Sequence, residues 1–235
     1  MKLGIIGAMD VEVSTLKSSM ENKIEKTIAG SVYCEGILEN LPVVVVQCGV
    51  GKVNAALCVQ VLCDCFHVTH VVNTGVAGSL DAKLDIGDFV ISCDAIYHDF
   101  DCHVLNVNYP VGQVPGLTVR AFPADDFLMK LAYRSADIEH PGHAYMGTVA
   151  SGDQFVCDKA QKQTIVENTG GLCTEMEGAA IAHGAWKNGV PFVIIRAISD
   201  KADDSAQMDY PTFEAIAAKR CAEVTKSMAR AMVEI

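Results

Sequence analysis

The fold of this chain is decided by the stretch PFVIIRAISD at residues 191–200. A continuous apolar run of this length is typical of a β-strand buried on both faces, as in sheets that helices cover. The run ends abruptly in Ser199 and Asp200. Because ligands of open α/β sheets bind outside the carboxyl ends of the strands, we expect a ligand site where this strand ends.

Two further strand-like runs also end in acidic residues. Glu175 and Glu177 follow the run GLCT at residues 171–174, and Glu12 follows KLGIIG at residues 2–7 after a short turn. We expect the ends of these strands to lie beside Asp200 at one edge of the sheet. An edge that carries several carboxyl groups predicts a site for proton transfer.

Arg196 interrupts the apolar run and must be explained separately. A charged group is very costly to bury without a partner. The sequence therefore predicts that Arg196 pairs with one of these carboxylates or with a bound substrate.

Strand-like and helix-like segments alternate along the rest of the chain. The other predicted strands are 2–7, 27–38, 41–50, 70–74, 88–96, 143–150 and 171–174. The predicted helices are 9–20, 52–65, 125–136, 158–168, 177–188 and 211–232, the last with Pro211 at its first position. The alternation predicts an α/β fold, a three-layer α/β/α sandwich around a mixed, largely parallel sheet, in one domain over residues 1–235.

Composition excludes several classes of function. The chain has 18 Lys and Arg against 29 Asp and Glu, a net charge of −11, which argues against a nucleic-acid partner. Without an apolar window of about 18 residues, we expect no membrane span. The ten cysteines and the histidines His98, His140 and His143 match no zinc spacing, so we expect reduced thiols, a cytoplasmic location and no metal.

Two glycine-rich turns are candidates for close ligand approach. Residues 49–52 read GVGK, but the chain lacks the remaining features of a phosphate-binding P-loop, since Val53 replaces its Ser or Thr. Residues 75–78 read GVAG and also lack a full nucleotide fingerprint. Either turn serves a ligand or only a tight bend. The long segment 97–124, with its proline and glycine breaks, is interpreted as a lid.

Several of these residues also have ordinary structural explanations. Asp200 could cap the next segment. Glu12 and Glu177 could be present only because the helix dipole stabilises acidic residues at helix N-termini. Phe155 could belong to the core or could stack on a flat ligand. The convergence of three acidic strand ends favours catalysis over these alternatives.

Six motifs in chain order carry a family resemblance. They are GIIGAM with Glu12, GVGKVNAA at 49–56, NTGVAG at 73–78, SGDQF at 151–155, EME at 175–177 and AISD at 197–200. Together they resemble the 5′-methylthioadenosine/S-adenosylhomocysteine nucleosidases, a branch of the nucleoside phosphorylase superfamily, over nearly the whole chain.

The resemblance implies a role for each of the main acidic residues. Asp200 would act as general acid at purine N7, and Glu12, assisted by Arg196, would activate the attacking water. Glu177 would hold the ribose hydroxyls, with Met176 beneath the sugar. No metal and no cofactor are implied.

The resemblance also implies how the rest of an adenine nucleoside would be bound. Phe155 would stack on adenine and the Val156 backbone would read its Watson–Crick edge. Further pocket residues would be Met9, Val76, Ala77, Gly78, Glu175, Ser199 and Tyr210. A homodimer is implied, with the loop at 101–109 covering the partner's substrate.

Two departures from the family pattern and three alternatives remain open. The segment 102–111 is longer than that pattern, which blurs which side chains line the 5′ pocket. Position 76 is Val, where many members of the family carry Ser. A purine nucleoside phosphorylase is disfavoured because Lys52 is the only basic residue in either glycine turn and Glu12 would repel phosphate. A catalytically silent relative is disfavoured by the complete set of acidic residues. The range of 5′ substituents, including 6-amino-6-deoxyfutalosine, stays undecided.

Overall fold

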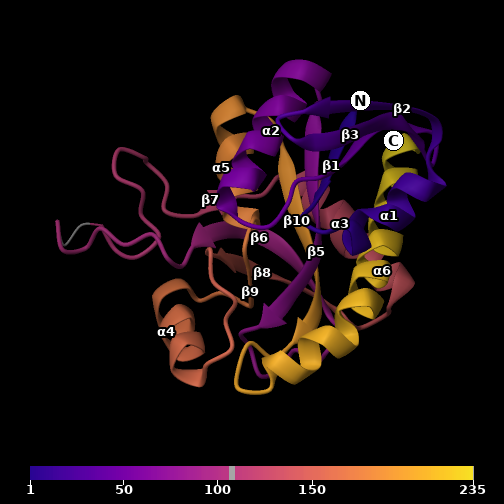
Figure 1. Cartoon of the computed structure of the whole chain (residues 1–235). Helices are drawn as coiled ribbons and strands as arrows, with labels where there is room; N and C mark the ends of the chain where they lie inside the picture. The colour runs from indigo at the N-terminus through magenta and orange to yellow at the C-terminus, as the bar shows by residue number, and fades with distance from the viewer. Residues whose placement is uncertain (106–108, 235) are drawn as a thin grey trace.

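The computed structural model describes residues 1–105 and 109–234 (Figure 1). The strands are β1 (Leu3–Gly7), β2 (Glu21–Ile28), β3 (Ser31–Leu38), β4 (Leu41–Gln47), β5 (His70–Ser79), β6 (Phe89–Tyr97), β7 (Phe122–Pro123), β8 (Ala144–Ser151), β9 (Cys173–Glu175) and β10 (Phe192–Asp200). The helices are α1 (Asp10–Ser19), α2 (Lys52–Phe66), α3 (Asp126–Glu139), α4 (Lys159–Thr169), α5 (Gly178–Asn188) and α6 (Ala206–Val233).

The strands form one mixed sheet, as predicted. Its order is β10-β6-β8-β9-β5-β1-β4-β3-β2, with β7 paired to β6. Because β5 also pairs with β10, the five strands from β10 to β5 close into a ring. Antiparallel pairs are more frequent than strand–helix alternation predicts, since β3, β6 and β9 run against neighbours.

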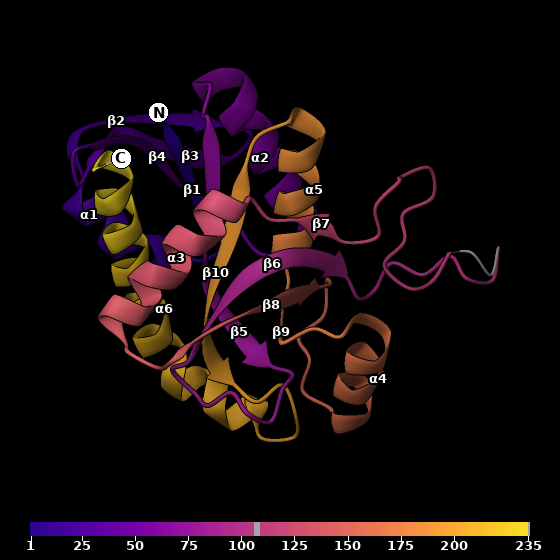
Figure 2. The ribbon, with the colours of Figure 1, turned by 180° about the vertical axis from the view of Figure 1, so that it is seen from behind.

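Helices cover both faces of this sheet, which confirms the three-layer prediction (Figures 1 and 2). One core lies under α1, α3 and α6 and contains Ile5 and Val193; the other lies under α2 and α5 and contains Ile6 and Ile194. Neighbouring strand residues thus point into opposite cores, as the period of a β-strand requires. Each such side chain contributes roughly 1.5–3 kcal/mol by its burial.

Three predicted strands differ clearly in extent from the observed ones. The predicted strand 41–50 ends at Gln47 in β4. The predicted strand 27–38 is two strands in the structure. Residues 27–28 end β2, and β3 begins at Ser31, because Ala29 and Gly30 between them form a turn with φ of 49° and 82°. The predicted strand 70–74 continues to Ser79 as part of β5, because pairing with β10 holds its residues through Gly78.

The start of the last helix was also predicted wrongly. Helix α6 begins at Ala206, so Pro211 lies inside it rather than at its first position. The Asp209 N–H already donates to the Ser205 carbonyl at 3.1 Å, so the helical turn forms before the proline. Pro211 lies past the first turn, where proline is readily tolerated, so α6 continues through it without the hydrogen bond that an N–H at this position would donate.

The predicted lid corresponds to the connection between β6 and β7, whose described residues extend away from the sheet (Figure 2). The part expected to cover a partner's substrate, 101–109, includes residues 106–108, which lie outside the described residues. The lid therefore stays a prediction. Across the described residues, no helix has the length and apolar character needed to cross a membrane.

Candidate active site

A pocket opens where β1, β5, β9 and β10 end. Its lining residues are Ala8, Met9, Glu12, Val50, Val76, Ala77, Gly78, Gln154, Phe155, Val156, Thr174, Glu175, Met176, Glu177, Ser199, Asp200 and Tyr210. Every site residue proposed from the sequence is among them except Arg196, which is fully buried. Sequence reasoning missed Ala8, Val50, Gln154 and Thr174. Each lies directly beside a predicted residue or inside one of the six motifs, so these four residues could have been found from their position in the chain.

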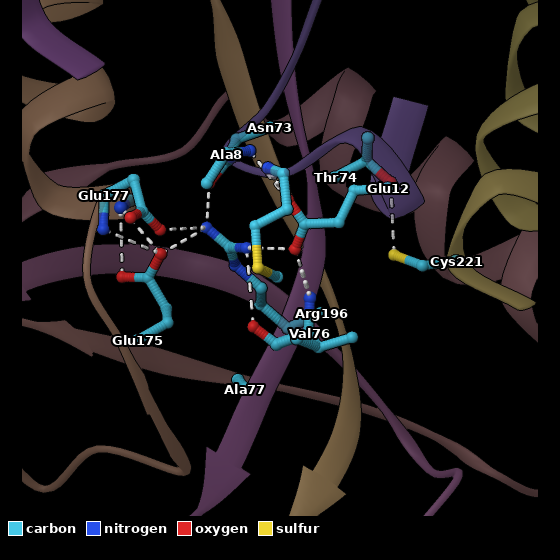
Figure 3. A network of polar contacts seen from close by, with 12 residues as sticks. Ala8, Glu12, Asn73, Thr74, Val76, Ala77, Glu175, Glu177, Arg196 and Cys221 are labelled. Carbon is cyan, nitrogen blue, oxygen red and sulfur yellow. Dashed lines mark hydrogen bonds and ion pairs between the residues drawn. The ribbon is translucent and has the colours of Figure 1, made fainter. Parts of the chain in front are cut away.

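Arg196 is the centre of a buried charge cluster beside the pocket (Figure 3). Its Nη2 donates to Glu175 Oε2 and to Asn73 Oδ1. Nη1 lies 3.9 Å from Glu12 Oε1, and Nη2 lies 3.8 Å from Glu177 Oε2. Burial alone would lower the pKa of the guanidinium, but the three carboxylates raise it. The prediction that Arg196 pairs with a carboxylate is confirmed.

Glu12 lies in the first turn of α1, where helix N–H groups lack helical partners. The backbone N–H groups of Ala8 and Met9 donate to Oε2 at 2.6 and 3.0 Å, and that of Val76 donates to Oε1 at 3.0 Å. Burial raises the pKa of Glu12, although Arg196 and these three donors lower it. The carboxylate is therefore held rigidly at the pocket wall.

Asp200 is the last residue of β10 and is only 3% exposed. Its Oδ2 accepts from the Ser199 hydroxyl at 2.9 Å, and Oδ1 accepts from the Ala202 N–H at 2.8 Å. Burial raises the pKa of Asp200, and the negative charges of Asp209 and Asp203 add to the rise. The two hydrogen bonds lower the pKa, so burial is what shifts this carboxyl group toward its protonated form.

Glycines in β5 let both carboxyl groups approach the strand. A Cβ at Gly75 would lie 2.3 Å from Glu12 Oε1 and from Arg196 Nη1, and a Cβ at Gly78 would lie 2.7 Å from Asp200 Oδ1. No side chain fits at either position without displacing these groups. The GVAG motif therefore provides space for the site.

The two carboxylates of the EME motif have different surroundings. Glu175 accepts from the Ser151 hydroxyl, from the Glu177 and Gly178 N–H groups and from the buried guanidinium, so protein donors occupy both of its oxygens. Glu177 accepts from the Gly51 N–H at 2.8 Å through Oε1. Burial and the charge of Glu175 raise the pKa of Glu177 to about 7. Glu177 is thus the better placed of the two to meet a ligand.

Two aromatic rings form the outer wall of the pocket. Phe155 and Tyr210 meet edge to face with ring centroids 5.4 Å apart. The Tyr210 hydroxyl lies 3.3 Å from Met9 Sδ and donates to Glu214 at 2.9 Å. Phe155 remains 46% exposed, whereas Val156 beside it is buried. An exposed ring at a pocket mouth is free to stack on a flat ligand.

Two of the histidines considered as metal ligands, His140 and His143, lie in one turn, where the His143 N–H donates to the His140 carbonyl at 3.2 Å. Both have other partners, since His143 Nδ1 contacts Asp88 at 2.7 Å and His140 stacks on Phe89. His98 is buried directly after β6. Within residues 1–105 and 109–234, no three His, Cys, Asp or Glu side chains gather as a metal-ligand set. All ten cysteines are free thiols.

Comparisons with known proteins identify the family of the chain. The sequence model of the phosphorylase superfamily matches residues 2–230. The 5′-methylthioadenosine/S-adenosylhomocysteine nucleosidase of Geobacillus thermodenitrificans is 41% identical over 229 residues, 97% of this chain and 96% of that protein. The nucleosidase of the same name from Neisseria meningitidis, solved with methylthio-immucillin-A, matches with a TM-score of 0.94 and 34% identity over 98% of this chain and 99% of that one. The futalosine hydrolase of Helicobacter pylori matches with a TM-score of 0.92 and 33% identity over 100% and 98%.

Proposed function

Because the chain belongs to the phosphorylase superfamily, and within it to the 5′-methylthioadenosine/S-adenosylhomocysteine nucleosidases, we propose that it hydrolyses the N-glycosidic bond of both nucleosides. The products are adenine and a 5-thio-substituted ribose, which enters methionine salvage. One observation carries the proposal: Glu12 and Asp200 are buried carboxyl groups in the same pocket with different surroundings. N-glycosidic cleavage needs an acid at the leaving base and a base for water.

The proposed step moves one proton at each end of the pocket. Asp200 gives its proton to N7 of adenine, and the bond between N9 and C1′ breaks with its electron pair going to the base. Adenine therefore leaves neutral. The oxygen of a water molecule bonds to C1′, and Glu12 accepts its proton. Proton exchange with solvent then restores both carboxyl groups.

The sugar is placed by the acidic side of the pocket. Glu177 accepts from the ribose hydroxyls, and Met176 packs beneath the ring. Glu175 holds Arg196, which keeps the carboxylates of Glu12 and Glu177 in place. A positively charged, oxocarbenium-like sugar is stabilised between these negative groups.

The base is placed by the opposite side of the pocket. Phe155 stacks on adenine, while the Val156 backbone donates to N1 and accepts from the N6 amino group. Ser199 orients the carboxyl group that protonates N7. The backbone of Ala77 and Gly78 provides a surface against which a planar base can lie.

The 5′ substituent and the attacking water share the side formed by Met9, Val76 and Tyr210. Val76 contributes an apolar side chain there, and its N–H is already bonded to Glu12. The water is therefore positioned by Glu12 rather than by a hydroxyl at position 76.

Phosphorolysis, the reaction of other superfamily members, fits this pocket poorly. The one basic side chain of the glycine turns, Lys52, contacts both oxygens of Asp99 at 2.6 Å. The buried carboxylate of Glu12 would repel a phosphate dianion at C1′. A neutral water molecule is not repelled by Glu12, so water is the nucleophile in the proposed reaction.

A second substrate, 6-amino-6-deoxyfutalosine, also merits a direct test. The similarity to the futalosine hydrolase of Helicobacter pylori favours it. Initial rates on a panel of adenine nucleosides that differ only at the 5′ position would rank the candidates. If the initial rate on 6-amino-6-deoxyfutalosine were below about one per cent of the rate on the best substrate, this nucleoside would not be a substrate of the protein.

We also propose that the chain, as one domain over 1–235, forms a homodimer in the reducing cytoplasm. Support for a dimer comes from α2, where Val53 and Leu57 are 71% and 53% exposed beside Val50. Exposed apolar side chains of this kind are typical of protein interfaces. Ten free thiols fit a reducing compartment. Light scattering should give about twice 25.1 kDa, and a fully active monomer would contradict the dimer.

The hydrolytic function is tested by product analysis in a buffer without phosphate or added metal. We expect 5′-methylthioadenosine to be split into adenine and methylthioribose. Turnover that begins only when phosphate is added, with a sugar 1-phosphate as product, would replace hydrolysis by phosphorolysis.

A further inference from the structure

We propose that Lys52 is a positioning residue that ties together the two parts of the pocket that bind ribose and adenine. The inference rests on the proposed function for the identity of these ligands. Lys52 does not line the pocket and takes no part in the steps described above.

Lys52 joins three segments that are far apart in the chain. Its Nζ contacts both carboxylate oxygens of Asp99 at 2.6 Å and lies 3.8 Å from Asp153 Oδ2. Its backbone N–H donates to Asp153 Oδ1 at 2.8 Å, and the Asp153 N–H donates to Asp99 Oδ2 at 2.9 Å. The start of α2, the segment after β6 and the loop after β8 are thereby held together by one closed set of contacts.

The two segments that Lys52 and Asp153 join each continue directly to residues that bind the substrate in the proposed function. The residue before Lys52, Gly51, donates its N–H to Glu177 at 2.8 Å. The residues after Asp153 are Gln154, Phe155 and Val156, all of which line the pocket. Moving the start of α2 relative to the loop would therefore displace the ribose acceptor and the base-binding loop together.

The charge of Lys52 is what makes the arrangement stable. The carboxylates of Asp99 and Asp153 lie 2.6 and 3.8 Å from the same ammonium, and without that cation their like charges would repel each other. Lys52 and Asp99 are only 22% and 16% exposed, so water screens their attraction incompletely. The Lys52 ammonium also lies 5.4 Å from the centre of the Tyr97 ring, which favours the same position.

Loss of this tie should affect binding more than chemistry, because Glu12 and Asp200 are held by other donors. Lys52→Met should raise KM and lower kcat/KM on the order of 10- to 100-fold, the range expected from misplaced binding groups. Lys52→Arg should restore most of the activity, since a guanidinium binds a carboxylate through two hydrogen bonds. Lys2→Met is the matched control: Lys2 is 25% exposed and lies 2.5 Å from Glu35 Oε1, at the amino end of β1.

A double-mutant cycle tests whether Lys52 acts through Asp99. Asp99→Asn should raise KM as Lys52→Met does. The double variant should lose no more than the more damaged single variant, because both substitutions break the same contact. If the double variant lost kcat/KM by the product of the two single losses, the contact between Lys52 and Asp99 would not be the origin of either loss.

Amide hydrogen exchange provides a readout that needs no turnover. In Lys52→Met, exchange at 153–156 and at Gly51 should become faster than in wild type, and Lys2→Met should leave it unchanged. A lower melting temperature with unchanged KM and unchanged exchange at these amides would overturn the proposal. A wild-type protein that cleaves neither nucleoside would contradict the proposed function, whereas faster exchange in Lys52→Met would still support the tie.

Discussion

The two buried carboxyl groups of the pocket, Glu12 and Asp200, have different hydrogen-bond donors and charged neighbours. Glu12 receives three backbone N–H donors and lies 3.9 Å from the guanidinium of Arg196. Asp200 receives one N–H and one hydroxyl, and in the described part of the chain it forms no ion pair. The comparison teaches how one pocket can hold both a base and an acid. Burial raises the pKa of both groups. At Glu12 a cation and three N–H donors oppose that rise, whereas at Asp200 two hydrogen bonds oppose it and the charges of two aspartates add to it.

The largest expected effect comes from removing the base. Glu12→Gln should lower kcat by about 10²- to 10⁴-fold, the usual contribution of a general base. The fold should survive, because the amide oxygen can still accept from Ala8 or Met9. Steady-state kinetics and a melting curve check both statements. A kcat within tenfold of wild type would show that another group activates water.

Changing the base of the substrate tests the other region. 5′-Methylthioinosine carries a carbonyl at C6 and a proton on N1, which reverses both expected contacts with the Val156 backbone. Each mismatch leaves a buried polar group unpaired, so the two together should lower kcat/KM on the order of 10²- to 10⁴-fold. Equal efficiency on the adenine and hypoxanthine nucleosides would show that Val156 does not read the base.

The charge cluster at the sugar side should also influence stability. The pKa of Glu177 in the folded protein is raised to about 7 from an ordinary value of 4.5. A raised pKa means that its contribution is fully present below pH 4.5 and is lost as the pH rises through 7. Between pH 5 and 8 the wild type should therefore lose up to about 3 kcal/mol of unfolding free energy relative to Glu177→Gln. Urea unfolding of both proteins across this range measures the difference, and parallel curves would contradict it.

The smallest expected effect is a shift of one pKa. The Ser199 hydroxyl donates to Asp200 and lowers its pKa, against the larger effect of burial. Ser199→Ala should therefore raise the pKa of Asp200 and move the alkaline limb of the kcat profile to higher pH. A limb that moves to lower pH would show that the hydroxyl stabilises the protonated carboxyl instead.

Much of this site could be predicted from local sequence, because strand ends and buried charge follow simple rules. The run at 191–200 predicted the position of Asp200, and the cost of an unpaired buried charge predicted that Arg196 has a carboxylate partner. The roles of Met9, Phe155 and Tyr210 came from the family resemblance, since spacing alone cannot separate core from ligand contact.

Contacts between distant segments could not be predicted in this way. The pairing of Lys52 with Asp99 depends on the β6 end meeting the start of α2. The closed ring of strands depends on β5 pairing with β10 and β9 at once. Neither has a local signature, because chain spacing does not record which strands become neighbours.

The central claim, that Asp200 is the acid and Glu12 the base, is tested most directly by a substrate whose leaving group needs no proton. A 4-nitrophenyl riboside with a 5-methylthio group provides one. On 5′-methylthioadenosine, Asp200→Asn should lose about 10²-fold or more, and on the nitrophenyl substrate less than about tenfold, while Glu12→Gln should lose about 10²-fold or more on both. Equal losses of the two variants on both substrates would contradict the assignment.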